Sequence, residues 1–150
     1  MYAQGYSPWN ISLLEIKRTW IYVDLFFMKN PIIARRIKQL MVIEITVLGL
    51  PPYKQTHADD NEREQQIERS KALKDEARKI CKSVSNSEVS LDIKYSRYKG
   101  RADPANIIGG IADALQGIAY VNDSQAKTIH YSETKGGKDQ YTVSITVTEE

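Results

Sequence analysis

The sequence predicts a compact α+β domain, within the broad α/β class, in which two helices pack on a mixed sheet of about four strands. Segments in which apolar and polar residues alternate, the pattern of half-buried strands, are interspersed with segments whose apolar residues recur every three or four positions, the pattern of helices. The expected order is strand, helix, strand, helix, strand, strand. A chain of 150 residues, 41% hydrophobic and 27% charged, is long enough for one core and short for two.

The first strand and the first helix are predicted within residues 42–84. Residues 42–48 alternate in period two, and the sequence GLPPY that follows predicts a turn. A long polar stretch opens at Asn61, and its apolar residues fall on one helical stripe, which is the expected buried face. The residues of this stripe are Leu73, Ala77, Ile80, Cys81 and Val84.

A second strand and a second helix are predicted within residues 88–116. Residues 88–98 alternate, and the inward positions are Val89, Leu91, Ile93 and Tyr95. Asp103 is a suitable N-cap and Pro104 suits the first helical turn, so a helix is expected over residues 104–116. Gly117 is the expected end of that helix.

Two adjacent glycines, Gly109 and Gly110, lie inside this predicted helix, where each is less favourable than alanine by about 1 kcal/mol. Two explanations are open. Glycines near a helix N-terminus let a phosphate-bearing backbone or a partner helix come close. They also allow tight packing against the sheet or across a dimer.

The last two strands are predicted to form a hairpin that closes the domain. Residues 128–132 alternate, and the sequence ETKGGKD joins them to a second alternating segment. The inward positions of that last segment are Tyr141, Val143, Ile145 and Val147.

Residues 1–40 are interpreted as an N-terminal extension of unknown role, and residues 41–150 as the folded domain. The extension holds six Lys/Arg and two Asp/Glu, so the remainder is slightly negative although the whole chain is +2. A DNA-binding surface on the domain must then be a local patch. The most apolar stretch, residues 20–28, is too short for a bilayer, and a single cysteine fits a reducing, cytoplasmic setting.

Three oxygen-bearing residues, Asp103, Asn106 and Asp123, are predicted to converge at the N-terminal end of the second helix. Residues 105–116 rise about 18 Å as a helix, and residues 118–122, if extended, travel back about 17 Å. Oxygen ligands of this kind suit Mg²⁺ or Mn²⁺, which activates water and neutralises phosphate. The simpler interpretation makes Asp103 a plain helix cap and Asp123 a plain turn residue.

Basic residues gather just before Asp103 and are candidates for contacts with DNA phosphates. They are Lys94, Arg97, Lys99 and Arg101, with Tyr95 and Tyr98 interleaved. A charged strand end is otherwise a solvated face. Lys135 and Lys138, on the glycine-rich connection, are further candidates.

The motifs DPAN, DALQG, NDSQ and TKGG, in this order, resemble those of the RusA family of Holliday-junction resolvases. That family carries D-x-D-N, a following D-A-L and D-D-x-Q, after a strand that ends in a proline-rich turn, similar to EITVLGLPPYK. The resemblance covers residues 41 to about 148. It implies a homodimeric, Mg²⁺-dependent endonuclease that nicks two symmetric strands of a four-way DNA junction in recombination and repair.

Carried over residue by residue, the motifs place Asp103 and Asp123 as catalytic metal ligands and Asn106 beside them. Ala105 stands where D-x-D-N has its second aspartate, and Asn122 where D-D-x-Q has its first. Losing a carboxylate leaves less negative charge to hold a divalent cation. One hypothesis is a variant endonuclease in which Asn106 or Asn122 completes the oxygen shell. The other is a weak or inactive dimer that binds branched DNA without cutting it.

Overall fold

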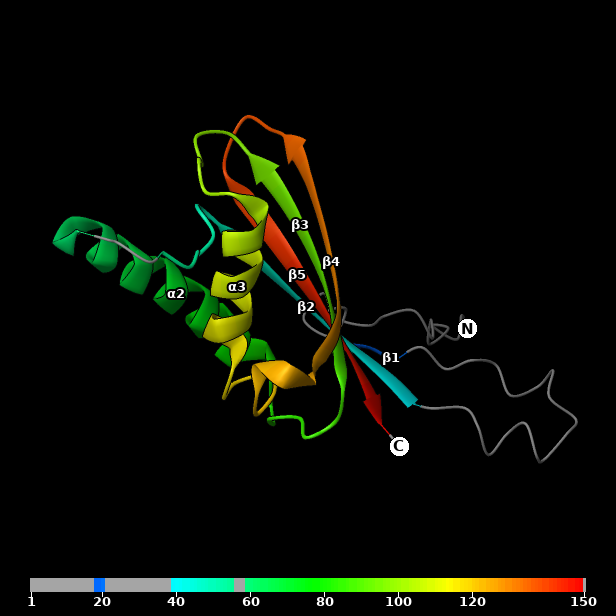
Figure 1. Ribbon diagram of the computed structural model, residues 1–150. Coiled ribbons are helices and arrows are strands. Elements are labelled where there is room, and N and C mark those ends of the chain that lie inside the picture. Colours follow the sequence, from blue (N-terminus) through cyan, green and yellow to red (C-terminus); the bar gives the residue numbers. More distant parts are fainter. Residues whose placement is uncertain (1–17, 21–38, 56–58, 150) are drawn as a thin grey trace, which may run out of the picture.

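The computed structural model describes residues 18–20, 39–55 and 59–149, and it has the predicted α+β architecture (Figure 1). The elements in chain order are β1 (Arg18–Trp20), β2 (Gln39–Leu48), α2 (Asp60–Ile80), β3 (Val89–Arg97), α3 (Pro104–Leu115), the 3-10 turn η2 (Asp123–Gln125), β4 (Ala126–Lys135) and β5 (Gln140–Glu149). The sheet order is β1-β2-β5-β3-β4. The sheet is mixed because β3 and β4 run parallel, whereas the other neighbours are antiparallel.

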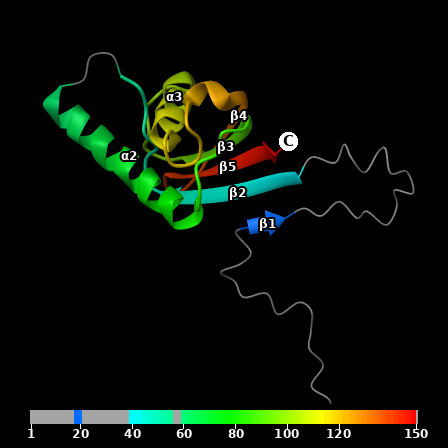
Figure 2. The same ribbon diagram turned by 90° about the horizontal axis from the view of Figure 1, so that it is seen from below.

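Both helices cover the same face of the sheet, and the core lies between these two layers (Figure 2). The inward positions predicted for the strands are buried, because alternate residues of a strand face the same side. They are Ile43, Ile45 and Val47 on β2, Val89, Leu91, Ile93 and Tyr95 on β3, and Tyr141, Val143, Ile145 and Val147 on β5. Neither α2 nor α3 is long and apolar enough to cross a membrane.

The helix α2 is shorter than its predicted apolar stripe. Asp59 caps it by accepting a hydrogen bond from the Glu62 N–H at 2.8 Å, and Leu73 and Ala77 are its buried residues. The chain leaves the helix at Cys81, which has an extended backbone and packs at the edge of the core. The prediction for Val84 was therefore wrong: it lies beyond the helix and is 41% exposed.

The predicted C-terminal hairpin is also wrong. The strands β4 and β5 are consecutive in the chain, but β3 lies between them and pairs with both (Figure 1). The connection of residues 136–139 crosses the end of β3, where the Gly136 N–H donates to the Arg97 carbonyl at 2.9 Å. Alternation of apolar and polar residues predicts which side of a strand is buried, but it does not predict which strand lies next to it in the sheet.

Most of the predicted N-terminal extension lies outside the described residues. Its one described element, β1, pairs with β2 and extends the sheet, with Thr19 opposite Val42. The strand β2 begins at Gln39, two residues before the predicted start of the domain.

We expect a chain shortened to residues 41–150 to unfold cooperatively, because every residue of the described core belongs to that range. Urea unfolding followed by circular dichroism checks this expectation. A shortened chain that is insoluble, or that unfolds without a cooperative transition, would show that the first forty residues are part of the folding unit.

Candidate active site

Asp103 begins α3 as its N-cap, as predicted. The Asn106 backbone N–H donates to Asp103 Oδ1 at 2.9 Å, and the Asn106 side-chain amide donates to Oδ2 at 2.6 Å. Both side chains are exposed. Each carboxylate oxygen keeps a further lone pair, and the Asn106 amide keeps its carbonyl oxygen, so this end of α3 presents hard oxygen donors.

The two glycines of α3 have different neighbours. A Cβ on Gly110 would lie 2.5 Å from the Pro52 carbonyl oxygen and 2.5 Å from Tyr53 Cα, so the turn after β2 lies directly on the helix backbone. The same turn is tied down where the Lys54 N–H donates to the Asn106 carbonyl at 3.0 Å. A Cβ on Gly109 would meet only the flexible Lys54 side chain, at 2.9 Å from Cδ. Close intramolecular packing therefore explains Gly110.

Asp123 lies in η2, just before β4 begins. The N-cap Asn122 forms a reciprocal capping box with Gln125: Asn122 Oδ1 accepts from the Ser124 N–H at 3.0 Å, and the Asn122 N–H donates to Gln125 Oε1 at 2.8 Å. The Gln125 amide donates in turn to the carbonyls of Ser85 and Ser87 at 2.9 and 2.7 Å. These bonds fix η2 beside the start of β3 and leave the Asp123 side chain exposed.

Asp103 and Asp123 do not converge within one chain, which corrects the prediction from chain length. Asp103 is the N-cap of α3, whereas the segment that carries Asp123, η2, follows the turn at the other end of that helix (Figure 1). The twelve residues of α3 rise about 18 Å. The segment after α3 does not run back along the helix. It turns at Gly117, where φ is +80°, and folds over the C-terminal end, where the buried Tyr120 donates to the Ala112 carbonyl at 2.7 Å.

The site residues of one chain do not by themselves fit a divalent cation. At the start of α3 there is one carboxylate with Asn106, and η2 contributes one carboxylate with Asn122 at the other end. In the ranges 18–20, 39–55 and 59–149, no three His, Cys, Asp or Glu side chains are grouped as metal ligands. A divalent cation that takes several oxygen ligands would need further ligands from outside this one chain.

Four of the six predicted DNA-contacting residues lie at the end of the sheet from which the chain runs to Asp103. Lys99 and Arg101 belong to the β3–α3 loop (residues 98–102), and Lys135 and Lys138 lie where β4 passes into β5. All four are exposed. The register places Lys135 opposite Arg97 at the end of β3, so these cations share the end of the sheet from which the loop leads to α3. Lys94, the fifth, is exposed on β3 and forms an ion pair with Asp92 at 3.7 Å.

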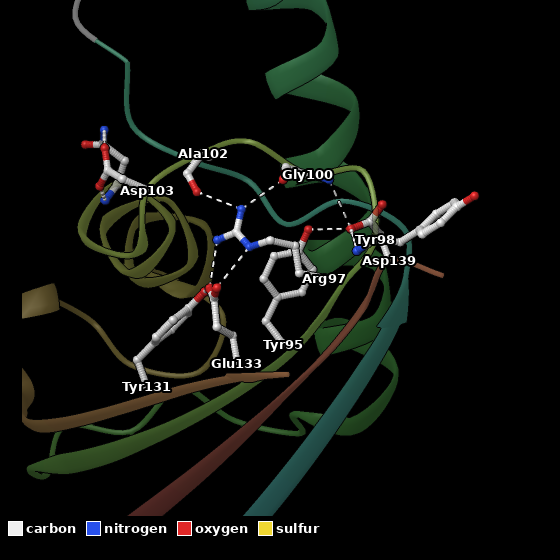
Figure 3. Close-up of polar contacts among 10 residues, drawn as sticks. Tyr95, Arg97, Tyr98, Gly100, Ala102, Asp103, Tyr131, Glu133 and Asp139 are labelled. Carbon is white, nitrogen blue, oxygen red and sulfur yellow. Dashed lines mark hydrogen bonds and ion pairs between the residues drawn. The ribbon is translucent and has the colours of Figure 1, made fainter. Parts of the chain in front are cut away.

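Arg97, the sixth, is bound within the molecule (Figure 3). Its guanidinium donates to Glu133 through Nε and Nη2 at 3.2 and 2.8 Å, and Nη1 donates to the carbonyls of Gly100 and Ala102 at 3.0 Å each. The hydrogen bonds from Arg97 lower the pKa of the Glu133 carboxyl, and so does the bond from the Tyr131 hydroxyl. Four of the five guanidinium N–H groups are occupied.

Asp139, like Glu133, was not predicted from the sequence to belong to this end of the molecule. It accepts from the backbone N–H groups of Tyr98, Lys99 and Gly100 at 2.9, 2.9 and 3.3 Å, and from the Tyr95 hydroxyl at 2.5 Å. Partial burial works to raise its pKa, but these hydrogen bonds prevail and lower the pKa of Asp139 to about 2. The carboxylate is therefore charged at neutral pH.

Glu133 carried a detectable sequence signal. It lies on the same face of the sheet as Arg97, one strand away, and opposite charges on one face of neighbouring strands indicate an ion pair. The signal is readable only if β3 and β4 are known to be neighbours, and the hairpin prediction had paired β4 with β5. Asp139 follows a glycine turn and carried no comparable signal.

Comparison with known proteins agrees with the motifs found in the sequence. No curated protein sequence matches the chain. The family model described as endodeoxyribonuclease RusA matches residues 35–148, which include β2, β3, β4, all but the last residue of β5, both helices and the two aspartates. The chain therefore belongs to the RusA endodeoxyribonuclease family.

Proposed function

We propose that the protein is a divalent-metal-dependent endonuclease that binds and nicks four-way DNA junctions as a homodimer. The observation that carries the proposal is the position of Asp103, at the exposed start of α3, after a sheet end that bears four exposed cations, in a chain of the RusA family. A carboxylate with a metal ion activates water, and the surrounding Lys and Arg side chains attract the phosphate backbone.

The open edge of the sheet supports the homodimer. The strand β4 is ten residues long, and β3 is its only neighbour in the described sheet. Ile129, whose register partner Leu91 is buried in the core, is 37% exposed at this edge. Long edge strands with apolar residues are templates for pairing with another chain.

Antiparallel pairing of two β4 strands about a two-fold axis would bring the two aspartates to the same place. It sets the start of one β4 against the end of the other. Asp123 lies three residues before the start, and the β3–α3 loop leads from the end of the sheet to Asp103. Each Asp123 would then face Asp103 of the partner subunit, although the two are far apart within one chain.

This dimer would supply the second carboxylate ligand that each end of α3 lacks within a single chain. Asp103 and Asn106 from one subunit and Asp123 from the other would hold Mg²⁺ or Mn²⁺, whereas Asn122 is committed to capping η2. The bound ion would supply Lewis-acid activation of water and neutralise charge on the scissile phosphate. The protein residues contribute orientation: Asn106 fixes both Asp103 oxygens, and Gln125 fixes the turn that carries Asp123.

We expect the double substitution Lys99→Ala and Arg101→Ala to weaken binding to all junction sequences alike, because phosphate contacts do not distinguish bases. The slope of log K against log salt should become shallower by about 1.8, since each lost contact removes about 0.9. Fluorescence anisotropy at several salt concentrations measures this slope. Lys71→Ala with Lys82→Ala, two exposed lysines on and after α2, is the matched control, and an equal effect of both pairs would argue against this DNA surface.

The test of the function is nicking of a synthetic four-way junction with Mg²⁺ or Mn²⁺, run beside a gel-shift. We expect nicks in two symmetric strands of the junction, and only when the metal is present. Binding without nicking would favour the alternative, a branched-DNA-binding dimer made inactive by the missing carboxylate at Ala105. A protein that neither binds nor nicks the junction would overturn both the endonuclease and the binding-only hypothesis.

Ala105→Asp tests whether the missing carboxylate limits the reaction. Ala105 is exposed in the first turn of α3, so an aspartate there adds a negative oxygen ligand beside Asp103. We expect the cleavage rate to rise by about tenfold or more and half-saturation to occur at lower Mg²⁺. Ala105→Asn, which has the same shape without the charge, is the control. Equal rates for both variants and the unsubstituted protein would show that the site is complete without this carboxylate.

A further inference from the structure

The β3–α3 loop carries the chain from the sheet to Asp103, and it is held from two sides by side chains outside the RusA motifs (Figure 3). On one side, three consecutive backbone N–H groups of the loop, from Tyr98 to Gly100, donate to the Asp139 carboxylate. Asp139 belongs to the connection that crosses the end of β3, so the sheet itself anchors these amides. The Tyr95 hydroxyl, on the last buried position of β3, donates to the same carboxylate.

On the other side, the Arg97 guanidinium holds the loop carbonyls. It donates to the carbonyl of Ala102, the residue directly before Asp103, and to that of Gly100. Glu133 fixes the guanidinium through a bidentate pair, which is geometrically specific because two parallel N–H···O bonds must form together. The guanidinium also stacks over the Tyr95 ring, 4.9 Å from its centroid.

The loop has little freedom between these two anchors. A Cβ on Gly100 would lie against the Tyr95 hydroxyl and 3.0 Å from Leu50, so the loop backbone is packed directly on the end of the sheet. The Arg97 side chain is 20% exposed and its charge is balanced by Glu133, in contrast to the exposed Lys99 and Arg101. A guanidinium paired in this way has little attraction left for a phosphate.

We propose that Arg97, Glu133 and Asp139 are positioning residues for the endonuclease: they set where α3 begins and hence where Asp103 is held. The inference rests on the proposed function and names residues for it that lie outside the sequence motifs by which this chain resembles the family. Metal ligands must be held to within about 0.5 Å, and a misplacement of about 1 Å costs on the order of 100-fold in rate. Two anchors on adjacent residues of one short loop provide that restraint.

Arg97→Lys distinguishes positioning from a phosphate contact. Lysine keeps the charge, but one ammonium cannot reproduce the bidentate pair and the two carbonyl bonds together. We expect kcat for junction nicking to fall by 10- to 100-fold, with KM and the salt slope of binding changed less than twofold. Near-normal kcat with Arg97→Lys, or a salt slope shallower by about 0.9 with Arg97→Gln, would overturn the proposal and make Arg97 a phosphate ligand.

If the Arg97 variants fail to fold, Glu133→Gln can be measured in their place. It keeps the shape of the Glu133 side chain and removes the charge that fixes the Arg97 guanidinium. The Arg97→Lys and Glu133→Gln effects on kcat should be non-additive, since both release the same anchor. Asp92→Asn, an acidic residue on the opposite face of β3 paired with His130 and Lys94, is the control and should leave kcat unchanged. Additive effects, or an equal loss with Asp92→Asn, would contradict a specific anchor.

Amide hydrogen exchange separates failure of this inference from failure of the proposed function. Glu133→Gln and Asp139→Asn should increase exchange at the amides of Lys99, Gly100 and Asn106 at least tenfold, whether or not the protein cuts DNA. If the unsubstituted protein nicks no junction, the proposed function fails and exchange still decides on the anchor. Unchanged exchange at these amides in both variants would overturn the inference even in an active nuclease.

Discussion

Subunits that carry Asp103→Asn, mixed with subunits that carry Asp123→Asn, are expected to regain junction cleavage that neither variant has alone. Each variant by itself removes one carboxylate from both sites of its dimer, and we expect cleavage to fall by at least about 100-fold. In a mixed dimer, one site receives both substitutions and the other receives neither, if Asp103 and Asp123 come from different subunits. The physical reason is the antiparallel β4 edge, which sets opposite ends of two α3 helices at the same place.

The fraction of nicking activity that returns depends on how the two kinds of subunit pair at random. In an equal mixture about half of the dimers are mixed, each with one intact site, so about a quarter of the normal nicking activity should return. These dimers should nick one strand of a junction and leave the symmetric strand uncut. Co-expression with two different affinity tags and tandem purification yields the mixed dimer for a denaturing-gel assay.

Mixing two preparations of the same variant is the control and should restore nothing. A purified mixed dimer that remains inactive would show that Asp103 of one subunit does not share a site with Asp123 of the other. Full activity of either variant alone would remove that residue from the site altogether.

Gly110→Ala should destabilise the protein by about 1–3 kcal/mol, although alanine favours helices. The added methyl would lie 2.5 Å from the backbone of Pro52 and Tyr53, and a backbone turn cannot move aside as the end of a side chain can. That turn also bonds to the Asn106 carbonyl through Lys54, so its displacement would disturb the first turn of α3. The midpoint of urea unfolding measures the loss.

Gly109→Ala is the matched control for this substitution, one position earlier in the same helix. Its methyl would meet only the Lys54 side chain, which can rotate away into solvent, so the helix preference of alanine should dominate. We expect it to be neutral or stabilising by up to about 1 kcal/mol. Equal destabilisation by both substitutions would mean that the contact of Gly110 with the turn is not what governs stability in this region.

Local patterns in the sequence were sufficient for the elements and for the inner face of each strand. Alternation identified the buried residues of β2, β3 and β5, and Asp103 and Gly117 marked the ends of α3. These features depend on neighbours within a few positions, where side-chain direction and capping are decided by backbone geometry alone. The motif order was likewise sufficient for the family, because it is a property of the chain and not of its folding.

The positions of strands and turns relative to one another required the tertiary structure. Inserting β3 between β4 and β5 decided that Arg97 meets Glu133 and that Asp139 reaches the loop before Asp103. The turn after α3 decided that Asp123 lies at the far end of the helix, because burying Tyr120 keeps the chain there although its length would allow a return. Chain length limits how far a segment reaches, but burial and long-range hydrogen bonds, summed over residues distant in sequence, determine where it goes.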